Sequence, residues 1–312
     1  MRTTGGRNTH VIGVRGNFDD CQSGVKAIFA TERFARFSSA NSINWGRLLP
    51  QIVYYFYAYG QMAAKGAMPH GAAIDICVPT GNFGNILAAW YAAKMGLPVC
   101  SFLCASNEND VLTEAIADGR YNRNRPFYQT PSPSMDILIS SNFERFLYDV
   151  SGCDSAYTAA AFAEMRESGC FIIPQALRAN WQEKLYAGRA TADEAFGAIR
   201  KAFAHYGYLF DPHTAYGYAV AEQFRGKPGD DTPLLLASTA SPFKFPAAVL
   251  QALGEPVGNV AETALPALLR ETTGWDIPAS LDGLENLPLL HDRIVAPQQM
   301  ADAVRSALAE KR

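Results

Sequence analysis

The chain has 312 residues, of which 48% are hydrophobic and 18% are charged, and its formal net charge is −3. This length is enough for one large domain or two smaller ones with a substantial core. The near-neutral charge and the lack of a long basic stretch argue against a nucleic-acid partner, and no apolar run is long enough to span a membrane.

In chain order, apolar periodicity predicts alternating strands and helices in the first part of the chain. The expected elements are a strand at 10–13, a helix at 19–29, a helix at 45–65, a strand at 73–78, a turn at 79–85, a helix at 86–95, a strand at 97–104 and a helix at 109–116. Pro50 is expected in the first turn of its helix, where proline is tolerated. The strand–turn–helix–strand unit at 73–104 is typical of a parallel sheet.

The second part of the chain reads as mostly helical after a long irregular loop at 119–133. The expected elements are helices at 142–150, 155–167, 175–186, 191–205 and 213–224, a strand at 233–237, a helix from 242 and an amphipathic helix near 298–311. Thr191 and Glu194 form a capping-box pattern. The predicted fold class is α/β, rich in helices, with a parallel sheet.

The six cysteines include no Cys-x-x-Cys pair, and the five histidines are too few to complete a zinc set. We therefore expect no metal site. Free thiols are typical of the reducing cytoplasm, and the N-terminus lacks the apolar core of a signal peptide. The expected location is cytoplasmic.

The turn Val78-Pro79-Thr80-Gly81-Asn82-Phe83-Gly84-Asn85 is the most informative segment. It links an apolar strand to a helix, so backbone amides and the helix dipole can converge there on one phosphate. Its two glycines permit close approach of an anion. It matches neither Gly-x-Gly-x-x-Gly nor a Walker loop. The alternative is an ordinary strand–helix turn whose glycines serve only its own geometry.

Three further polar turns precede helices, at 38–47, 211–214 and 237–245. The last follows an apolar strand, so it would lie with the glycine turn at the carboxyl ends of the sheet, where ligands gather. The turn at 38–47 could cradle a phosphate or a carboxylate. Helix capping explains the turn at 38–47 equally well and is the favoured explanation of the turn at 237–245 taken alone, and we read His213 as a capping or structural residue.

Taken together, four segments resemble the threonine synthase family. They are Asn41–Gln51, Val78–Asn85, Pro212–Ala215 (Pro-His-Thr-Ala) and Ser238–Phe245 (Ser-Thr-Ala-Ser-Pro-Phe-Lys-Phe). Family-like segments also begin at Asn17, Ala105 and Ser132, and all occur in the family order. The resemblance implies a fold-type II pyridoxal phosphate (PLP) enzyme like the tryptophan synthase β subunit, with a parallel sheet covered by helices on both faces and the N-terminal part of the fold missing.

The resemblance also implies a reaction, the conversion of O-phospho-L-homoserine and water to L-threonine and phosphate in threonine biosynthesis. It implies that the cofactor phosphate is held by Gly81, Asn82, Phe83, Gly84 and Asn85. It implies that the Thr239 hydroxyl meets the pyridine nitrogen, a neutral contact that favours elimination chemistry. The candidates for contacts with the substrate are Asn41, Ser42, Asn44, Arg47 and Lys244.

The sequence departs from the family in two places. The family string His-Pro-Ala-Lys-Phe is replaced by Ser-Pro-Phe-Lys-Phe at 241–245. The Schiff-base lysine of the family lies in a Phe-Lys-Asp segment, which does not occur here, so no catalytic residue is assigned. Our hypothesis is a truncated or split threonine synthase. The alternatives are another fold-type II lyase, or an inactive module of this fold that binds a metabolite or a partner.

Three domains are expected: a remnant of the small N-terminal domain at 1–45, a PLP-binding α/β domain at 46–254, and a C-terminal extension at 255–312 that packs on it. The expected partners are O-phosphohomoserine and either the missing N-terminal segment or a second copy of the chain. A truncation would leave an apolar patch or sheet edge uncovered, so we expect self-association of the chain alone.

Overall fold

The structure is a computed structural model that describes residues 2–3, 5–6, 8–31, 38–42, 44–225 and 231–309. It divides into two compact units, one made of residues 1–38 and 259–312 and the other of residues 39–258. The domain boundaries expected from the sequence remain a proposal. Ile43, within the family-like segment at 41–51, lies outside the described residues.

The first unit combines the two ends of the chain. Its elements are β1 (Gly13–Val14), α1 (Phe18–Phe29), η4 (Glu262–Ala264), α11 (Leu265–Thr273), η5 (Leu284–Asn286), β8 (Ile294–Val295), η6 (Pro297–Gln299) and α12 (Met300–Ala309). Asn17 and Asp20 form the capping box that starts α1. The strand expected at 10–13 is wrong in extent, because its parallel partner β8 pairs only with Gly13 and Val14.

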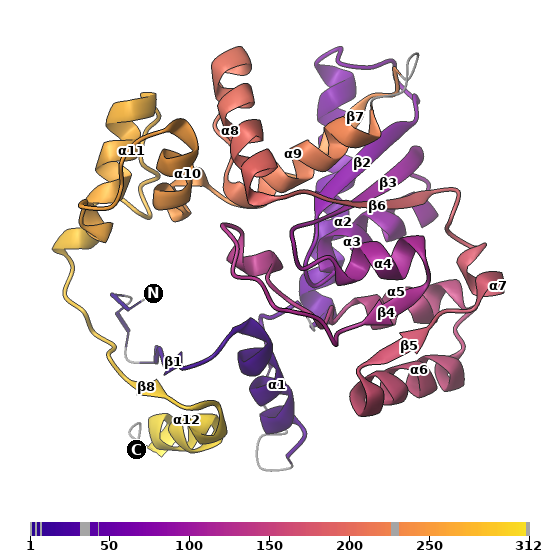
Figure 1. Ribbon diagram of the computed structural model, residues 1–312, viewed down its shortest axis with the longest axis horizontal. Helices are drawn as coiled ribbons and strands as arrows, with labels where there is room; N and C mark the ends of the chain where they lie inside the picture. The colour runs from indigo at the N-terminus through magenta and orange to yellow at the C-terminus, as the bar shows by residue number, and fades with distance from the viewer. Residues whose placement is uncertain are drawn as a thin grey trace. The chain divides into compact units, whose positions relative to one another are not determined.

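The second unit is built on a four-stranded parallel sheet with the order β6-β3-β2-β7 (Figure 1). The strands are β2 (Ile74–Pro79), β3 (Val99–Ser106), β6 (Leu185–Arg189) and β7 (Leu234–Leu236). All three pairings are parallel, so every strand ends at the same edge of the sheet. The parallel α/β sheet predicted from the sequence is confirmed.

Helices cover both faces of this sheet. Side chains alternate between the faces along a strand. Ile76 and Phe102 belong to the large apolar core on the side of α3 (Gly84–Lys94), where the Trp90 ring lies 5.5 Å from the Phe102 ring. On the other side, the Cys77 thiol donates to the Gly217 carbonyl oxygen of α9 (Pro212–Phe224) at 3.2 Å.

The remaining elements of this unit surround the sheet. They are α2 (Trp45–Ala64), α4 (Val111–Ala117), β4 (Arg120–Asn122), η2 (Pro133–Met135), α5 (Phe143–Val150), α6 (Ser155–Ser168), β5 (Cys170–Ile172), α7 (Gln175–Arg178), α8 (Ala192–Tyr206), η3 (Pro242–Lys244) and α10 (Pro246–Leu253). The capping box predicted for Thr191 and Glu194 is present at the start of α8. None of the helices in the described ranges is both long and apolar enough to cross a bilayer.

Two expectations for the middle of the chain are wrong. The helix expected at 175–186 is a single turn, α7, followed by strand β6. Because β3 has an open edge there, Leu185–Arg189 gain backbone partners in the sheet that a helix could not supply. Within the loop expected to be irregular, β4 pairs antiparallel with β5.

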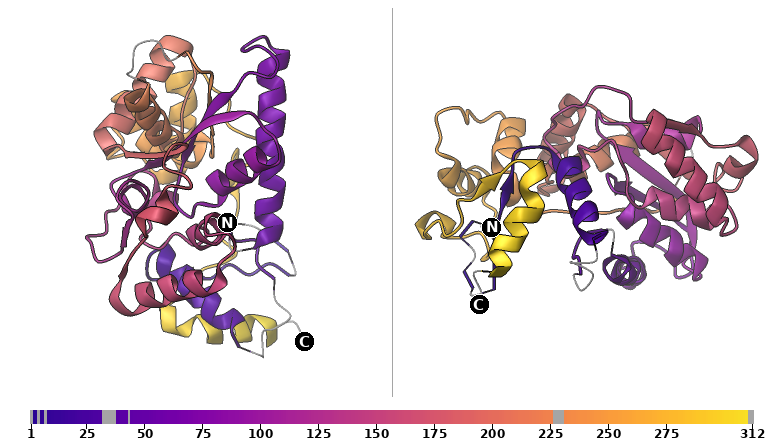
Figure 2. Two further views of the ribbon diagram at one scale, coloured as in Figure 1. Left: turned by 90° about the vertical axis from the view of Figure 1, so that its right-hand side faces the viewer. Right: turned by 90° about the horizontal axis from the view of Figure 1, so that it is seen from below.

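The long helix α2 is confirmed, but Pro50 is its sixth residue and so lies beyond the first turn. Proline has no N–H, so this turn of the helix lacks one backbone hydrogen bond. The buried side chains of α2 are Leu48, Ile52 and Tyr55. Figure 2 shows α2 as one uninterrupted helix at the side of the sheet.

The outer face of α2 is apolar and exposed. Its large exposed side chains are Trp45, Leu49, Val53, Tyr54, Phe56 and Tyr57. No charged residue occurs between Arg47 and Lys65. An exposed apolar surface of this length marks a contact site or an aggregation liability.

We expect the purified chain to self-associate through this face of α2. Replacing Tyr57 with lysine should raise the monomer fraction in light scattering, because burying an unpaired charge opposes association. Tyr206→Lys is the matched control, since Tyr206 is 70% exposed and Tyr57 is 68% exposed. A wild-type chain that stays monomeric at high concentration would contradict the expectation.

Candidate functional site

The glycine turn predicted from the sequence lies where β2 ends and α3 begins. The Thr80 N–H donates to the Ala105 carbonyl oxygen at 2.8 Å, which ends the strand ladder. Helix α3 starts two residues earlier than expected, at Gly84. The first free N–H groups of α3 therefore belong to the turn itself.

Phe83, the residue before α3, adopts a left-handed conformation with φ 61°. This conformation costs a residue with a side chain about 1–2 kcal/mol. Burial offsets that cost: the Phe83 side chain is 2% exposed, and its ring lies 5.3 Å from Phe143 and 5.2 Å from Phe146. Strain of this kind, held by packing, is characteristic of ligand-binding turns.

The segment at 140–142 donates hydrogen bonds to carbonyl oxygens of the glycine turn. The Ser140 hydroxyl donates to the Gly81 carbonyl oxygen at 2.8 Å. The backbone N–H and the side-chain amide of Asn142 both donate to the Asn82 carbonyl oxygen at 3.0 Å. Sequence reasoning missed this brace, because its residues carry no motif.

These hydrogen bonds occupy the carbonyl oxygens of Gly81 and Asn82 and do not involve the backbone N–H groups of the turn. Among the described residues, no protein acceptor is recorded for the backbone N–H groups of residues 81–85. A Cβ on Gly81 would lie 2.7 Å from the Ser134 carbonyl oxygen and 3.2 Å from the Met135 Cα. Amides at a helix N-terminus that have no acceptor among the described residues fit a phosphate group, while the backbone at 134–135 packs too closely on Gly81 to admit a side chain there.

Asn85 is fixed by a buried tyrosine of α2. The Tyr55 hydroxyl, buried on α2, donates to the Asn85 side-chain oxygen. That contact leaves the NH₂ of the Asn85 amide as its donor toward a ligand. Burial raises the pKa of the Tyr55 hydroxyl far above its ordinary value, so it remains a donor.

The second predicted turn lies beside the first. Strand β7 pairs with β2, and the Ala237 N–H donates to the Cys77 carbonyl oxygen at 2.9 Å as β7 ends. Thr239 follows and is exposed. Its hydroxyl has no hydrogen-bond partner within the described part of the chain. The two turns therefore share the carboxyl edge of adjacent strands, as expected.

The candidate residues of the turn at 38–47 differ in their contacts. Ser42 adjoins the glycine turn, and the others contact residues of their own segment. A Cβ on Gly84 would lie 3.7 Å from the Ser42 Cβ, so Ser42 adjoins the glycine turn. Asn44 caps α2 by accepting the Gly46 N–H at 2.9 Å. Arg47 is exposed and donates to the Ala40 carbonyl oxygen at 2.6 Å. Asn41 accepts the Ser42 hydroxyl at 3.0 Å.

Arg145 is a cation near the glycine turn that sequence reasoning missed. Its guanidinium donates to the Ser42 carbonyl oxygen at 3.4 Å and to the Asn142 side-chain oxygen. Asn142 also donates to the Asn82 carbonyl oxygen, so it connects the Arg145 guanidinium to the glycine turn. Planar guanidinium groups suit phosphate and carboxylate recognition.

The described lysines are all exposed: Lys26, Lys65, Lys94, Lys184, Lys201 and Lys244. Lys94 and Lys201 pair with Asp149 and Glu222. Lys244 follows the Thr239 turn, with its ammonium 5.9 Å from the centre of the Phe245 ring. Lys227 and Lys311 lie outside the described residues.

A buried polar network supports the loop that closes on Gly81. The Asn107 amide donates to Asp136 Oδ1 at 2.7 Å, and the Thr130 N–H donates to Asp136 Oδ2 at 2.9 Å. Burial raises the pKa of the Asp136 carboxyl, although hydrogen bonds from Thr130 and Asn107 oppose the shift. No group of metal-ligating side chains is found in the described ranges.

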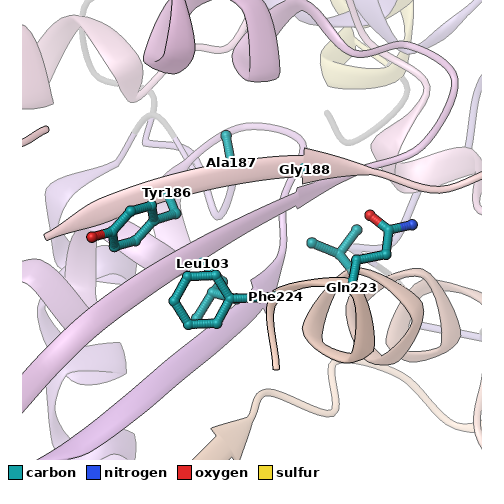
Figure 3. Close-up of a pocket in the computed structure, with 7 residues that line it drawn as sticks. Leu103, Tyr186, Ala187, Gly188, Gln223 and Phe224 are labelled. Atoms are coloured by element: carbon teal, nitrogen blue, oxygen red, sulfur yellow. The ribbon is translucent and has the colours of Figure 1, made fainter. Parts of the chain in front are cut away.

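One pocket of about 200 Å³ lies elsewhere, between β6, β3 and the end of α9 (Figure 3). It is lined by Leu103, Tyr186, Ala187, Gly188, Val220, Gln223 and Phe224. None of the predicted site residues lines it. Its apolar walls and small volume, below the ~300 Å³ typical of ligand pockets, make it a packing gap at the sheet edge.

The chain is similar to several known proteins. A family model described as "Threonine synthase, C-terminal" matches residues 214–289. The chain is 40% identical over 277 residues to threonine synthase of Pseudomonas aeruginosa, covering 87% of this chain and 56% of that protein. It is 43% identical over 256 residues to human threonine synthase-like 1, covering 79% of this chain and 34% of that protein.

Solved structures agree with these sequence matches. PLP-bound threonine synthase from Brucella melitensis has a TM-score of 0.77 and 36% identity, covering 97% of this chain and 61% of that one. Yeast threonine synthase has a TM-score of 0.78 and 32% identity, covering 96% and 60%. The chain thus spans about a third to about half of the length of the curated relatives named above.

Similarity of this degree extends over nearly the whole chain. The α/β architecture is accordingly that of fold-type II PLP enzymes. The chain belongs to the threonine synthase family.

Proposed function

We propose that this chain forms part of a PLP site. The turn at 81–85 binds the cofactor phosphate and is called the phosphate seat, and the Thr239 hydroxyl contacts the pyridine nitrogen. The observation that carries the proposal is the set of N–H groups at 81–85, which lie beside the turn of Thr239; neither these groups nor the Thr239 hydroxyl has a hydrogen-bond partner among the described residues. Gly81, Asn82, Phe83, Gly84 and Asn85 would hold the phosphate. When bound, the cofactor supplies an electron sink for charge that develops on an amino-acid substrate.

We further propose the threonine synthase reaction, in which O-phospho-L-homoserine and water give L-threonine and phosphate. The reaction must hold a substrate carboxylate and phosphate and release the phosphate. Ser42 adjoins Gly84, and the Arg145 guanidinium contacts Ser42 and Asn142, so these two residues are proposed to bind such anionic groups. Asn41, Asn44, Arg47 and Lys244 remain further proposed contacts.

The lysine that bonds the cofactor in the family has no counterpart among the six described lysines, all of which are exposed. We therefore expect this chain to bind PLP reversibly. After borohydride treatment, dialysis should remove the cofactor, and mass spectrometry should detect no pyridoxyl-lysine. A pyridoxyl group on any lysine of the chain would contradict this expectation.

The proposed reaction is tested by adding a polypeptide from a relative that carries the Phe-Lys-Asp segment. Threonine and phosphate should form in equal amounts from O-phosphohomoserine only in the mixture, and a lysine-to-alanine version of the added polypeptide is the control. A second candidate is a phospholyase that acts on a different amino acid, since one relative, 43% identical, is named threonine synthase-like 1 and not threonine synthase. Turnover of another phosphorylated amino acid in the same mixture would support that candidate.

The six cysteines form no disulfide. Free thiols suit a reducing compartment, and we propose the cytoplasm as the location of the protein.

A further inference from the structure

We propose that Asp211 is a positioning residue that fixes the distance between the two turns of the site, acting through His213 and Thr214. The inference rests on the proposed function, because it assigns the two turns to the two ends of one ligand. Asp211 itself lies at the start of α9, and its carboxylate is the point from which two chains of hydrogen bonds diverge.

The Asp211 carboxylate is buried and fully engaged. The residue is 1% exposed. Oδ1 accepts the backbone N–H of His213 at 2.9 Å and lies 3.0 Å from Nδ1 of the same residue, while Oδ2 accepts the Thr214 hydroxyl. Capping a helix needs only backbone donors. The two side-chain contacts therefore go beyond what the cap requires.

The first chain of contacts runs to Gly81. The Ser134 N–H donates to Nε2 of His213 at 3.2 Å. Since Nε2 accepts a hydrogen bond here, the ring proton lies on Nδ1, which donates a hydrogen bond to Asp211. The Ser134 carbonyl oxygen is the atom that closes on Gly81, 2.7 Å from where a Cβ would stand. Asp211 thus holds the wall of the phosphate seat.

The second chain of contacts runs to Thr239. Thr214 is buried, and its Oγ1 accepts the Thr239 N–H at 3.4 Å. The same oxygen lies 3.4 Å from the Ser238 hydroxyl oxygen. These contacts fix the backbone of the second turn and do not engage the Thr239 hydroxyl. The Asp211 carboxylate therefore holds both turns, the first through the His213 side chain and the second through the Thr214 side chain.

A ligand with a phosphate at one end and a ring nitrogen at the other binds both the phosphate seat and Thr239 only if these two places lie a set distance apart. Inorganic phosphate needs only the phosphate seat. Loosening the second chain of contacts should therefore weaken binding of PLP and leave binding of inorganic phosphate unchanged. A general loss of folding would weaken both.

The test compares the full chain with Thr214→Val, which keeps the side-chain shape and removes the hydroxyl, and with Thr214→Ser, which keeps the hydroxyl. PLP binding is measured by the absorption change on titration, and phosphate binding by phosphorus NMR. We expect Thr214→Val to lower PLP affinity about tenfold, the usual order for a lost buried hydrogen bond, with phosphate affinity within about twofold of wild type. Thr214→Ser should restore PLP affinity.

His213→Phe tests the first chain of contacts, because it keeps a ring beside Phe245, 4.7 Å away in wild type, and removes the acceptor for Ser134. It should weaken both PLP and phosphate, with the thermal melt still cooperative. Equal losses of both probes in Thr214→Val, or unchanged PLP affinity, would overturn the inference while the proposed function stands. A wild-type chain that binds neither probe would overturn both.

Discussion

Replacing Gly81 with alanine is expected to lower the affinity of the chain for PLP by roughly 10- to 100-fold. The new Cβ would lie 2.7 Å from the Ser134 carbonyl oxygen, and real Cβ atoms do not approach backbone so closely. Overpacking of this kind costs about 1–3 kcal/mol, and here the strain falls on the turn that would bind the phosphate. Titration with PLP, followed by absorbance, measures the loss.

The matched control for this change is Gly197→Ala. A Cβ on Gly197, within α8, would meet only the Arg200 guanidinium at 3.9 Å, so PLP affinity should not change. Affinity that is equal in wild type and Gly81→Ala would mean that PLP does not bind at this turn. The proposed function would then lose its main support.

The largest stability effect is expected for Phe146→Ala. The Phe146 ring packs within 5.8 Å, between ring centres, of Phe83, Trp90, Phe143 and Trp181. Removing a fully buried phenylalanine costs about 3–5 kcal/mol. In a unit of this size, each kcal/mol lowers the melting temperature by about 2–4 °C, which calorimetry resolves.

Tyr148→Ala on the same helix is the control for Phe146→Ala, because the Tyr148 side chain is exposed and should cost little. Phe146→Ala should also weaken PLP binding, since Phe146 supports the left-handed Phe83 at the turn. A normal melting temperature for Phe146→Ala would show that the aromatic cluster does not hold the second unit together.

The elements predicted well are those whose signal is local. The helix α2, the capping box of α8 and the strand–turn–helix at the glycine turn each depend on residues within a few positions of one another. The prediction for the residues of β6 was wrong because they resemble a helix in isolation and form a strand only beside β3. Tertiary context of this kind overrides local propensity.

The same distinction separates the parts of the site. The turns at 81–85 and 239 were recognisable, because glycines and hydroxyl residues mark them in the sequence. The contacts that hold those turns were not, since Ser140 reaches Gly81 across 59 positions and Ser134 reaches His213 across 79. Asp211 and Asn142 carry no pattern that distinguishes them from ordinary caps.

The pairing of β1 with β8 has a consequence for synthesis of the chain. Gly13 is aligned with Ile294, so β1 finds its partner only after residue 294 has been synthesised. Residues 39–258 emerge from the ribosome earlier and can fold first. Until Ile294 appears, β1 has no strand partner, and a ribosome stalled before that codon should display a folded second unit with a protease-sensitive segment around β1.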